Sequence, residues 1–173
     1  ELIANELQKI INQRHGEERI RESEEHYRLI AENTADTIAV LDLDMNFTYV
    51  SPSVLKLRGY TADEALKQRI DQIFTPSSLQ VIQTVYAEQM SLEEKGIGDP
   101  ERTVTLELEA YRKDGSTIWV EVAISSIRDI NGKPTGILIV SRNISKRKQA
   151  ERKVRELAAI VESTDDAIFS KTP

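Results

Sequence analysis

The sequence contains no cysteine among its 173 residues, and this absence excludes several kinds of site at once. Disulfide bonds, thiolate metal centres, cysteine nucleophiles and cysteinyl cofactor adducts all require a thiol. Histidine is nearly as scarce, with two residues, and aromatic residues make up 5% of the chain. The apolar runs fall far short of the roughly 18 residues that a membrane-spanning helix needs. We therefore expect no metal site and no membrane contact within these residues.

A basic surface is also missing, because 29 acidic residues outnumber 23 basic ones and the net charge is −6. Nucleic-acid-binding domains usually carry a basic face, so we expect no nucleic-acid partner. No signal peptide is recognisable, and we predict a cytoplasmic location. A glycine-rich phosphate loop, a nucleophilic triad and a phospho-accepting histidine motif are all absent from the sequence, so we predict that these residues are not catalytic.

The clearest pattern that is present covers residues 103–145, which predict three successive antiparallel strands. Apolar and polar residues alternate from Val104 onward, as in a strand with one buried face. Asp114-Gly115 and Asn131-Gly132 then mark two hairpin turns, because these dipeptides tolerate the positive φ that such turns require. The last run, 136–140, is apolar without a break and is predicted to lie in the middle of a sheet.

The preceding residues predict two more strands, 37–43 and 47–50, followed by helices that can cover the sheet. Short helices are expected at 53–57, closed by Gly59, and at 70–74. Thr61 and Glu64 have the spacing of a capping box and predict a helix that begins between them. Pro76 suits the first position of the longest internal helix, which ends before 96–100.

Charged helices are predicted at both ends of this block. Residues 1–26 are expected to form a helical, coiled-coil-like linker, and residues 146–160 an exit helix whose basic first turn opposes the helix dipole. Residues 28–40 and 158–170 also resemble each other at an offset of 130, which suits tandem modules. The identical pairs are Ile30/Ile160, Glu32/Glu162, Thr34/Thr164, Asp36/Asp166 and Ile38/Ile168. We interpret 161–173 as the beginning of a second, truncated repeat.

Taken together, four segments resemble the PAS domain with its PAC-type C-terminal half, as found in tandem in prokaryotic sensor histidine kinases, cyclic-di-GMP enzymes and chemoreceptors. The segments are EEHYRLIAENTADTIAVLDLD, SPSVLKLRGYTADEAL, YRKDGSTIWVEVAISSIRDINGKPTGILIVSRNIS and SKRKQAE. The resemblance implies an α+β fold at 27–145, with a five-stranded antiparallel sheet in the order 2-1-5-4-3. It also implies that the short helices and the long helix cover one face of this sheet and leave a cavity between them.

The resemblance also bears on cofactors, and we predict none. Haem-binding members place a histidine on the long helix, whereas His15 and His26 both lie in the leading segment. Light-sensing flavin members need a cysteine and read the flavin with Asn and Gln, where this chain has Val120 and Ser141. A photoreceptor is therefore not expected, and non-covalent flavin or haem are the less favoured alternatives.

Two interpretations of the sheet–helix interface remain open. Its residues either pack together as a closed core or line a small, mostly apolar ligand pocket with polar contacts from a serine and a tyrosine. The candidates are Ile38, Val40, Leu79, Ile82, Tyr86, Val120, Val122, Ile124, Ile137, Ile139 and Ser141.

The opposite face of the sheet is predicted to carry Trp119, which would contact a flanking helix or a partner subunit. Asn143, Ile144 and Ser145 stand where the family has its Asp-Ile/Val-Thr exit motif, and Ser145 is predicted to cap the exit helix. The expected function is a signal-relay module of a two-component histidine kinase or a diguanylate cyclase, joined to adjacent PAS and output domains. The alternative is a sensor that binds a ligand. We expect a homodimer through the leading helix and the outer sheet face, with contacts at Leu7, Ile10, Ile20, Tyr27 and Trp119.

Overall fold

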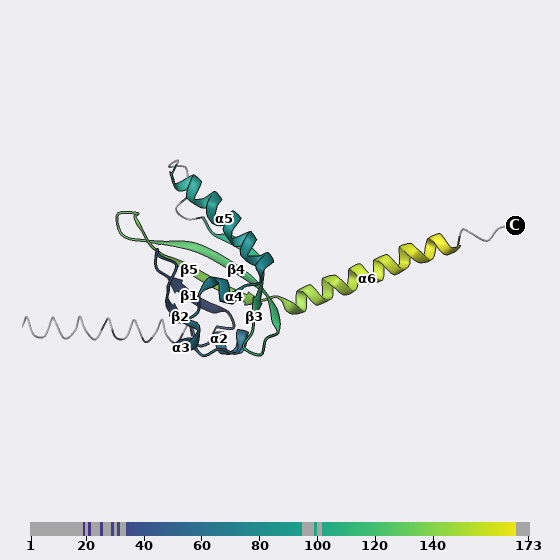
Figure 1. The fold of residues 1–173 in the computed structure, drawn as a ribbon, viewed down its shortest axis with the longest axis horizontal. Helices are drawn as coiled ribbons and strands as arrows, with labels where there is room; N and C mark the ends of the chain where they lie inside the picture. The colour runs from purple at the N-terminus through teal and green to yellow at the C-terminus, as the bar shows by residue number, and fades with distance from the viewer. Residues whose placement is uncertain are drawn as a thin grey trace, which may run out of the picture.

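The computed structural model describes residues 34–94, 99 and 102–168, together with five single helical positions of the leading segment, 19, 21, 25, 29 and 31. Within this part of the chain, five strands form one antiparallel sheet in the order β2-β1-β5-β4-β3 (Figure 1). The predicted α+β fold and strand order are confirmed. The strands are β1 (Thr37–Leu41), β2 (Phe47–Val50), β3 (Val104–Tyr111), β4 (Thr117–Arg128) and β5 (Pro134–Asn143).

Three hairpins with one common geometry connect neighbouring strands. In each, the backbone N–H of the residue before the turn donates to the carbonyl four residues later. Gly115 and Gly132 have φ of 84° and 78°, as the Asp-Gly and Asn-Gly pairs predicted, and Met45 has φ of 65° at the equivalent point of the first hairpin. These are turns with one left-handed residue, and they form one hairpin from β1 and β2 and a meander from β3, β4 and β5.

The unbroken apolar run of the last strand is explained by its place in the sheet. β5 pairs with β1 on one side and β4 on the other, so it lies in the centre as predicted. Gly136 is required there, because a Cβ at this position would come within 2.8 Å of the Leu41 carbonyl oxygen.

Helices α2 to α5 pack on one face of the sheet, which we call the inner face (Figure 1). Gly59, with φ of 82°, ends the first of them, and the capping box between Thr61 and Glu64 opens the second. The bounds are α2 (Val54–Arg58), α3 (Ala62–Ala65), α4 (Ile70–Ile73), α5 (Pro76–Glu94) and the exit helix α6 (Ser145–Ile168). α6 therefore continues eight residues beyond the predicted end of the linker at 160, and the second repeat stays a prediction.

The long helix α5 is attached to the edge strand β3 at its beginning. The Thr75 N–H donates to the Glu109 carbonyl at 3.0 Å, and the Glu109 N–H donates to the Ser78 hydroxyl at 2.8 Å. These bonds use backbone groups that an edge strand would otherwise present to solvent. Farther along α5, Tyr86 and Met90 are about half exposed, so the helix is fixed mainly at its N-terminal end.

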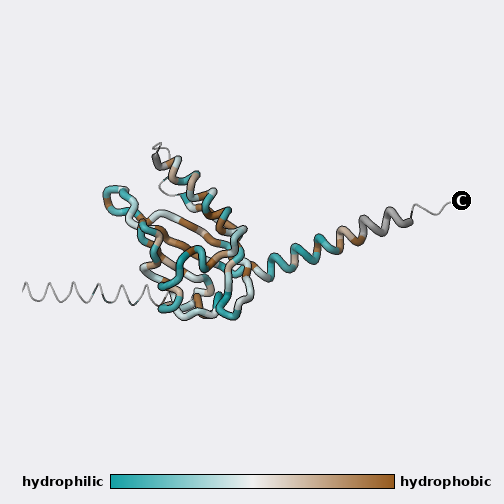
Figure 2. The backbone as a smooth tube through the Cα atoms, in the orientation of Figure 1, coloured by the Kyte–Doolittle hydropathy of each residue, from teal (hydrophilic) through white to brown (hydrophobic). Residues whose placement is uncertain are grey.

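The hydrophobic core lies between the inner face and the short helices. Its largest cluster joins Leu57 and Ile73 from the helices to Leu108, Val120 and Val122 from the sheet. Figure 2 shows the central strands as the hydrophobic part of the domain, whereas α6 begins with a hydrophilic segment where it leaves the sheet.

Candidate ligand cavity and exit-helix contacts

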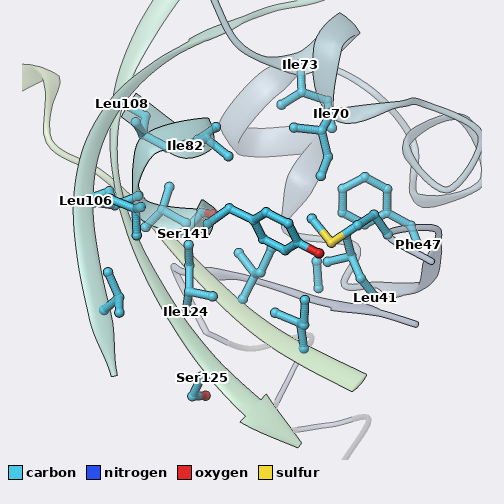
Figure 3. Close-up of a pocket in the computed structure, with 18 of the residues that line it drawn as sticks. Leu41, Phe47, Ile70, Ile73, Ile82, Leu106, Leu108, Ile124, Ser125 and Ser141 are labelled. Carbon is cyan, nitrogen blue, oxygen red and sulfur yellow. The ribbon is translucent and has the colours of Figure 1, made fainter. Parts of the chain in front are cut away.

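A cavity of about 520 Å³ lies between the inner face of the sheet and the helices α2, α4 and α5. This volume falls within the range of about 300–1,000 Å³ that small-molecule sites occupy. Figure 3 shows Leu106 and Ile124 on the sheet side of the cavity and Ile70 and Ile73 on the helix side. The sheet and helices therefore do not close completely over the core cluster, and the space between them is large enough for a ligand.

Most of the predicted interface residues line this cavity. Two come from α5, and the others come from β4 and β5. They are Ile82, Tyr86, Val120, Val122, Ile124, Ile137, Ile139 and Ser141.

Ile38 and Val40 do not line the cavity, and the prediction that they do is wrong. Thr37, Ala39 and Leu41 are the buried residues of β1 and line it instead. Because side chains alternate along a strand, Ile38 and Val40 lie on the opposite face. The segment is apolar on both faces, so its period-2 pattern does not tell which face is inward.

Leu79 is also absent from the residues that line the cavity, contrary to the prediction. Its turn of α5 lies next to the hydrogen bonds that hold Thr75 and Ser78 against β3. The helix first borders the cavity at Ile82, one turn later. The residues of α5 that line the cavity therefore begin at its second turn.

Polar residues line the cavity among a majority of apolar ones. Figure 3 shows the Ser125 side chain away from the labelled apolar cluster, whereas Ser141 lies among the apolar residues. The other uncharged polar residues of the lining are Thr37, Tyr86, Gln89 and Ser126. Val120 and Ser141, the positions compared with flavin-binding amides, both line the cavity and offer one hydroxyl and no amide.

The sequence-based prediction missed a charged residue of the cavity, Arg58. Its side chain is buried, although it occupies the last position of α2. The signal was available, because Arg58 follows Val54 by four residues and so lies on the same, buried face of the helix.

On the outer face of the sheet, Trp119 contacts the beginning of the exit helix. The Ile144 N–H donates to the Trp119 carbonyl at 3.0 Å, and the Trp119 N–H donates to the Ser145 hydroxyl at 3.3 Å. The Lys148 ammonium lies 5.1 Å from the centroid of the indole ring, within the range of a cation–π contact. The exit helix thus begins as a continuation of the hydrogen bonding of β4.

Two acidic residues on the outer face form ion pairs with the basic first turn of α6. Glu107 and Glu121 are directly opposite each other on β3 and β4, an arrangement in which like charges repel. The Arg147 guanidinium lies 2.5 Å from a carboxylate oxygen of Glu107 and 3.3 Å from one of Glu121, and Lys148 also pairs with Glu107. We call these four residues the exit clamp. They explain how a helix with a basic first turn is stable at this position.

The cations of the exit clamp affect the pKa of Glu107. The hydrogen bond from Lys148 holds the pKa of the Glu107 carboxyl below its ordinary value, and the charges of Lys148 and Arg147 act in the same direction. Glu107 is therefore ionised at neutral pH.

The exit motif forms its contacts differently from the prediction. The Asn143 side-chain oxygen accepts from the Ser145 N–H at 2.9 Å, and Ser145 is the first helical residue. Its hydroxyl accepts from the neighbouring strand, so the prediction that Ser145 caps its own helix is wrong. Asp36 and Arg142, the latter one residue before Asn143, form a bidentate ion pair with N···O distances of 2.7 Å and 3.0 Å, which we call the brace. The hydrogen bond from Arg142 lowers the pKa of Asp36.

The predicted subunit contacts of the leading helix, Leu7, Ile10, Ile20 and Tyr27, lie outside the described residues. Within the described part, no group of three or more His, Asp or Glu residues is placed to hold a metal ion. No helix in that part is long and apolar enough to cross a membrane.

The chain can now be compared with known families. The family model of the PAS domain matches residues 35–146. The chain belongs to the PAS domain family. PAS domains of this kind are sensory modules of signalling proteins, as the curated relatives illustrate.

Two relatives from Escherichia coli are the probable diguanylate cyclase DgcE and the signal transduction histidine-protein kinase AtoS. The first is 22% identical over 148 residues and the second 25% over 137 residues, which are 86% and 79% of this chain. These matches cover 13% and 21% of the respective relatives, so the chain corresponds to a small part of their length.

The fold is also found in the crystal structure of the PAS domain of an HTR-like protein from Haloarcula marismortui. That structure superimposes with a TM-score of 0.60 at 24% sequence identity, covering 76% of this chain and 99% of the other. At this identity the similarity establishes the fold.

Proposed function

We propose that this PAS domain senses a small, mostly apolar ligand in the cavity and transmits its binding to α6. The observation that carries the proposal is the cavity of about 520 Å³ on the inner face, backed by the same strands that hold the exit helix on the outer face. The structure favours this alternative over the closed core, because a relay without a ligand needs no cavity of this size.

The route of transmission follows the alternation of β4. Val120 and Val122 line the cavity, whereas Trp119 and Glu121, next to them in sequence, contact α6. A ligand that displaces β4 by a fraction of a residue spacing moves the side chains on both faces of the strand, those that line the cavity and those that contact α6. Ligand binding then shifts the population of two arrangements of the exit helix.

The binding step can be tested with the neutral fluorescent dye N-phenyl-1-naphthylamine. We expect saturable fluorescence enhancement with the chain, and loss of binding when Ile82→Trp and Ile124→Trp together fill the cavity from facing walls. Trp substitution of the exposed Val81, on the same helix as Ile82, is the matched control and should leave binding unchanged. Equal dye binding by the filled variant would contradict a cavity site.

We also propose, as a second function supported by a different observation, that α6 transmits the signal within a homodimer. Ala150, Val154 and Leu157 follow the spacing of a coiled-coil seam, and the latter two are 67% and 55% exposed. The leading helix and the outer face near Trp119 are the further contacts that we propose. Light scattering should give a dimer that Val154→Glu with Leu157→Glu weakens. A monomer in the unmodified chain would exclude this part of the proposal.

For the parent protein, we propose a cytoplasmic histidine kinase or diguanylate cyclase in which neighbouring PAS and output domains follow this module. The support is the kind of protein found among the relatives. In such a parent protein, Arg147→Ala should alter output activity while ligand affinity at the cavity is retained, and unchanged output would count against transmission through α6.

A further inference from the structure

Arg58 is the single buried charged residue in the described part of the chain, with 6% of its surface exposed. It lines the cavity next to Leu57, at the end of the cavity that Ala110 and the last part of β3 enclose. Burial lowers the pKa of the Arg58 guanidinium from its ordinary value, although arginine remains protonated in proteins. This end of the cavity is therefore positively charged.

The hydrogen bonds of Arg58 do not use the whole guanidinium group. Its Nε–H donates to the Tyr111 carbonyl at 2.9 Å, and the guanidinium carbon lies 5.0 Å from the centroid of the Tyr60 ring. The Nη2 atom is buried and has no hydrogen-bond acceptor among the described residues. The contacts thus hold the guanidinium through Nε and leave the Nη2 donor without an acceptor among the described residues.

A buried cation without a carboxylate partner is unfavourable, and structures generally supply an acceptor for such a group. The described ion pairs of this chain involve other basic residues, and none brings an acidic side chain to Arg58. The planar fork of a guanidinium matches a carboxylate in shape, which makes a carboxylate the fitting counter-ion. The remaining cavity walls near this end are apolar, with Leu57, Ile73 and Leu108.

We propose that the ligand of the cavity is an apolar monocarboxylate whose carboxylate pairs with Arg58 and whose hydrocarbon body lies along the apolar wall of the sheet. This inference rests on the proposed ligand-sensing function and names the chemical class of the ligand. The wall from Ala110 to Val104 spans six residue spacings, or about 20 Å at the rise of a strand, so an extended acyl chain fits along it.

Two further cationic residues, Arg102 and the partly buried Arg128, also line the cavity, and the test must separate them from Arg58. Arg128→Met is therefore measured beside Arg102→Met and should likewise keep the preference for a carboxylate. Arg102 is exposed to solvent and precedes β3, whereas Arg58 contacts the residue at the end of that strand. Water screens the charge of an exposed arginine, so Arg102 discriminates weakly between a charged and a neutral head group. Arg102→Met is therefore the matched control for Arg58→Met.

The experiment measures displacement of N-phenyl-1-naphthylamine by decanoate and by 1-decanol at neutral pH. We expect decanoate to bind at least about ten-fold more tightly than decanol, because a hydrogen bond to a charged group is stronger than one to a neutral group. Arg58→Met should remove this preference mainly by weakening decanoate binding, Arg58→Lys should restore part of it, and Arg102→Met should keep it.

Three results would overturn the proposal, and they separate it from the proposed function. Equal binding of decanoate and decanol by the unmodified chain would refute the carboxylate while leaving ligand sensing intact. If the preference for decanoate is lost in Arg102→Met and kept in Arg58→Met, the carboxylate binds at the Arg102 end of the cavity and the proposal is wrong. If the dye and both ligands fail to bind, the ligand-sensing function fails and this inference fails with it. Circular dichroism checks that each variant is folded. The comparison of decanoate with decanol on the unmodified chain tests the proposal even if a variant does not fold.

Discussion

The two faces of the sheet use the same strands for opposite purposes. The inner face carries apolar side chains and leaves a cavity beneath the helices, with Val120 and Val122 on its wall. The outer face carries Trp119, Glu107 and Glu121, which hold the exit helix through hydrogen bonds and ion pairs. The proposed sites of binding and transmission are thus separated by the thickness of one sheet, and the alternation of a single strand connects them.

The difference between the faces also concerns the kind of force that holds each side together. Apolar burial on the inner face is non-directional, so a ligand of suitable shape can replace part of the packing that is missing there. The exit clamp consists of exposed ion pairs, which contribute little to stability and are sensitive to geometry. A weak contact of this kind is suited to change state without unfolding the domain.

The largest effect is expected from a substitution that breaks the inner face. Leu108→Ala removes a side chain that is 1% exposed and should lower the free energy of unfolding by about 2–5 kcal/mol. Leu138→Ala, at a half-buried position whose neighbours in β5 line the cavity, should cost roughly half of that or less. Urea denaturation followed by circular dichroism measures both. Equal losses would contradict the assignment of the faces.

A substitution of the outer face should lower stability much less than Leu108→Ala and should release the exit helix. Arg147→Ala with Lys148→Ala removes both cations from Glu107, so backbone amides at 145–151 should exchange faster with solvent. Arg152→Ala is the matched control, because Arg152 pairs with Glu156 within the same helix. Hydrogen exchange detected by mass spectrometry checks this, and equal exchange in the two variants would argue against the clamp.

Acidification should break the ion pairs of Glu107 with Arg147 and Lys148 without any substitution. Since the folded-state pKa of Glu107 lies below its ordinary value, its stabilising contribution is fully present above the ordinary glutamate pKa and is lost as pH falls through the lowered value. Trp119 is the only tryptophan in the chain, so its fluorescence reports the event. Glu107→Gln should abolish the transition, and a transition that persists in this variant would assign it to other groups.

The smallest effect is expected at the brace between Asp36 and Arg142. Asp36→Asn should lower the free energy of unfolding by about 0.5–1 kcal/mol, because the Arg142 side chain is largely exposed and solvent screens the pair. Chemical denaturation at neutral pH measures the change, with Asp71→Asn, at the exposed pair with Arg69, as the control. A loss several times larger would show that the brace has a structural role beyond its charge.

The sequence was sufficient for the fold because its strongest signals were local. The glycines at 115 and 132 and the capping box of Thr61 each specify a turn or helix start through their own backbone chemistry. The face of β1 was not predictable in this way, because a strand that is apolar on both sides gives no alternation. The exit clamp was missed for another reason, since Glu107 and Arg147 are forty residues apart and meet only through strand pairing.

The central claim is that filling the cavity on the inner face changes the contacts between the outer face of the sheet and the exit helix α6. Hydrogen exchange at 145–151 tests it most directly when the unmodified chain is compared with the chain whose cavity is filled by Ile82→Trp and Ile124→Trp. We predict altered exchange at 145–151 together with unchanged exchange in the 129–133 hairpin. Identical exchange at 145–151 in two folded proteins would contradict the claim.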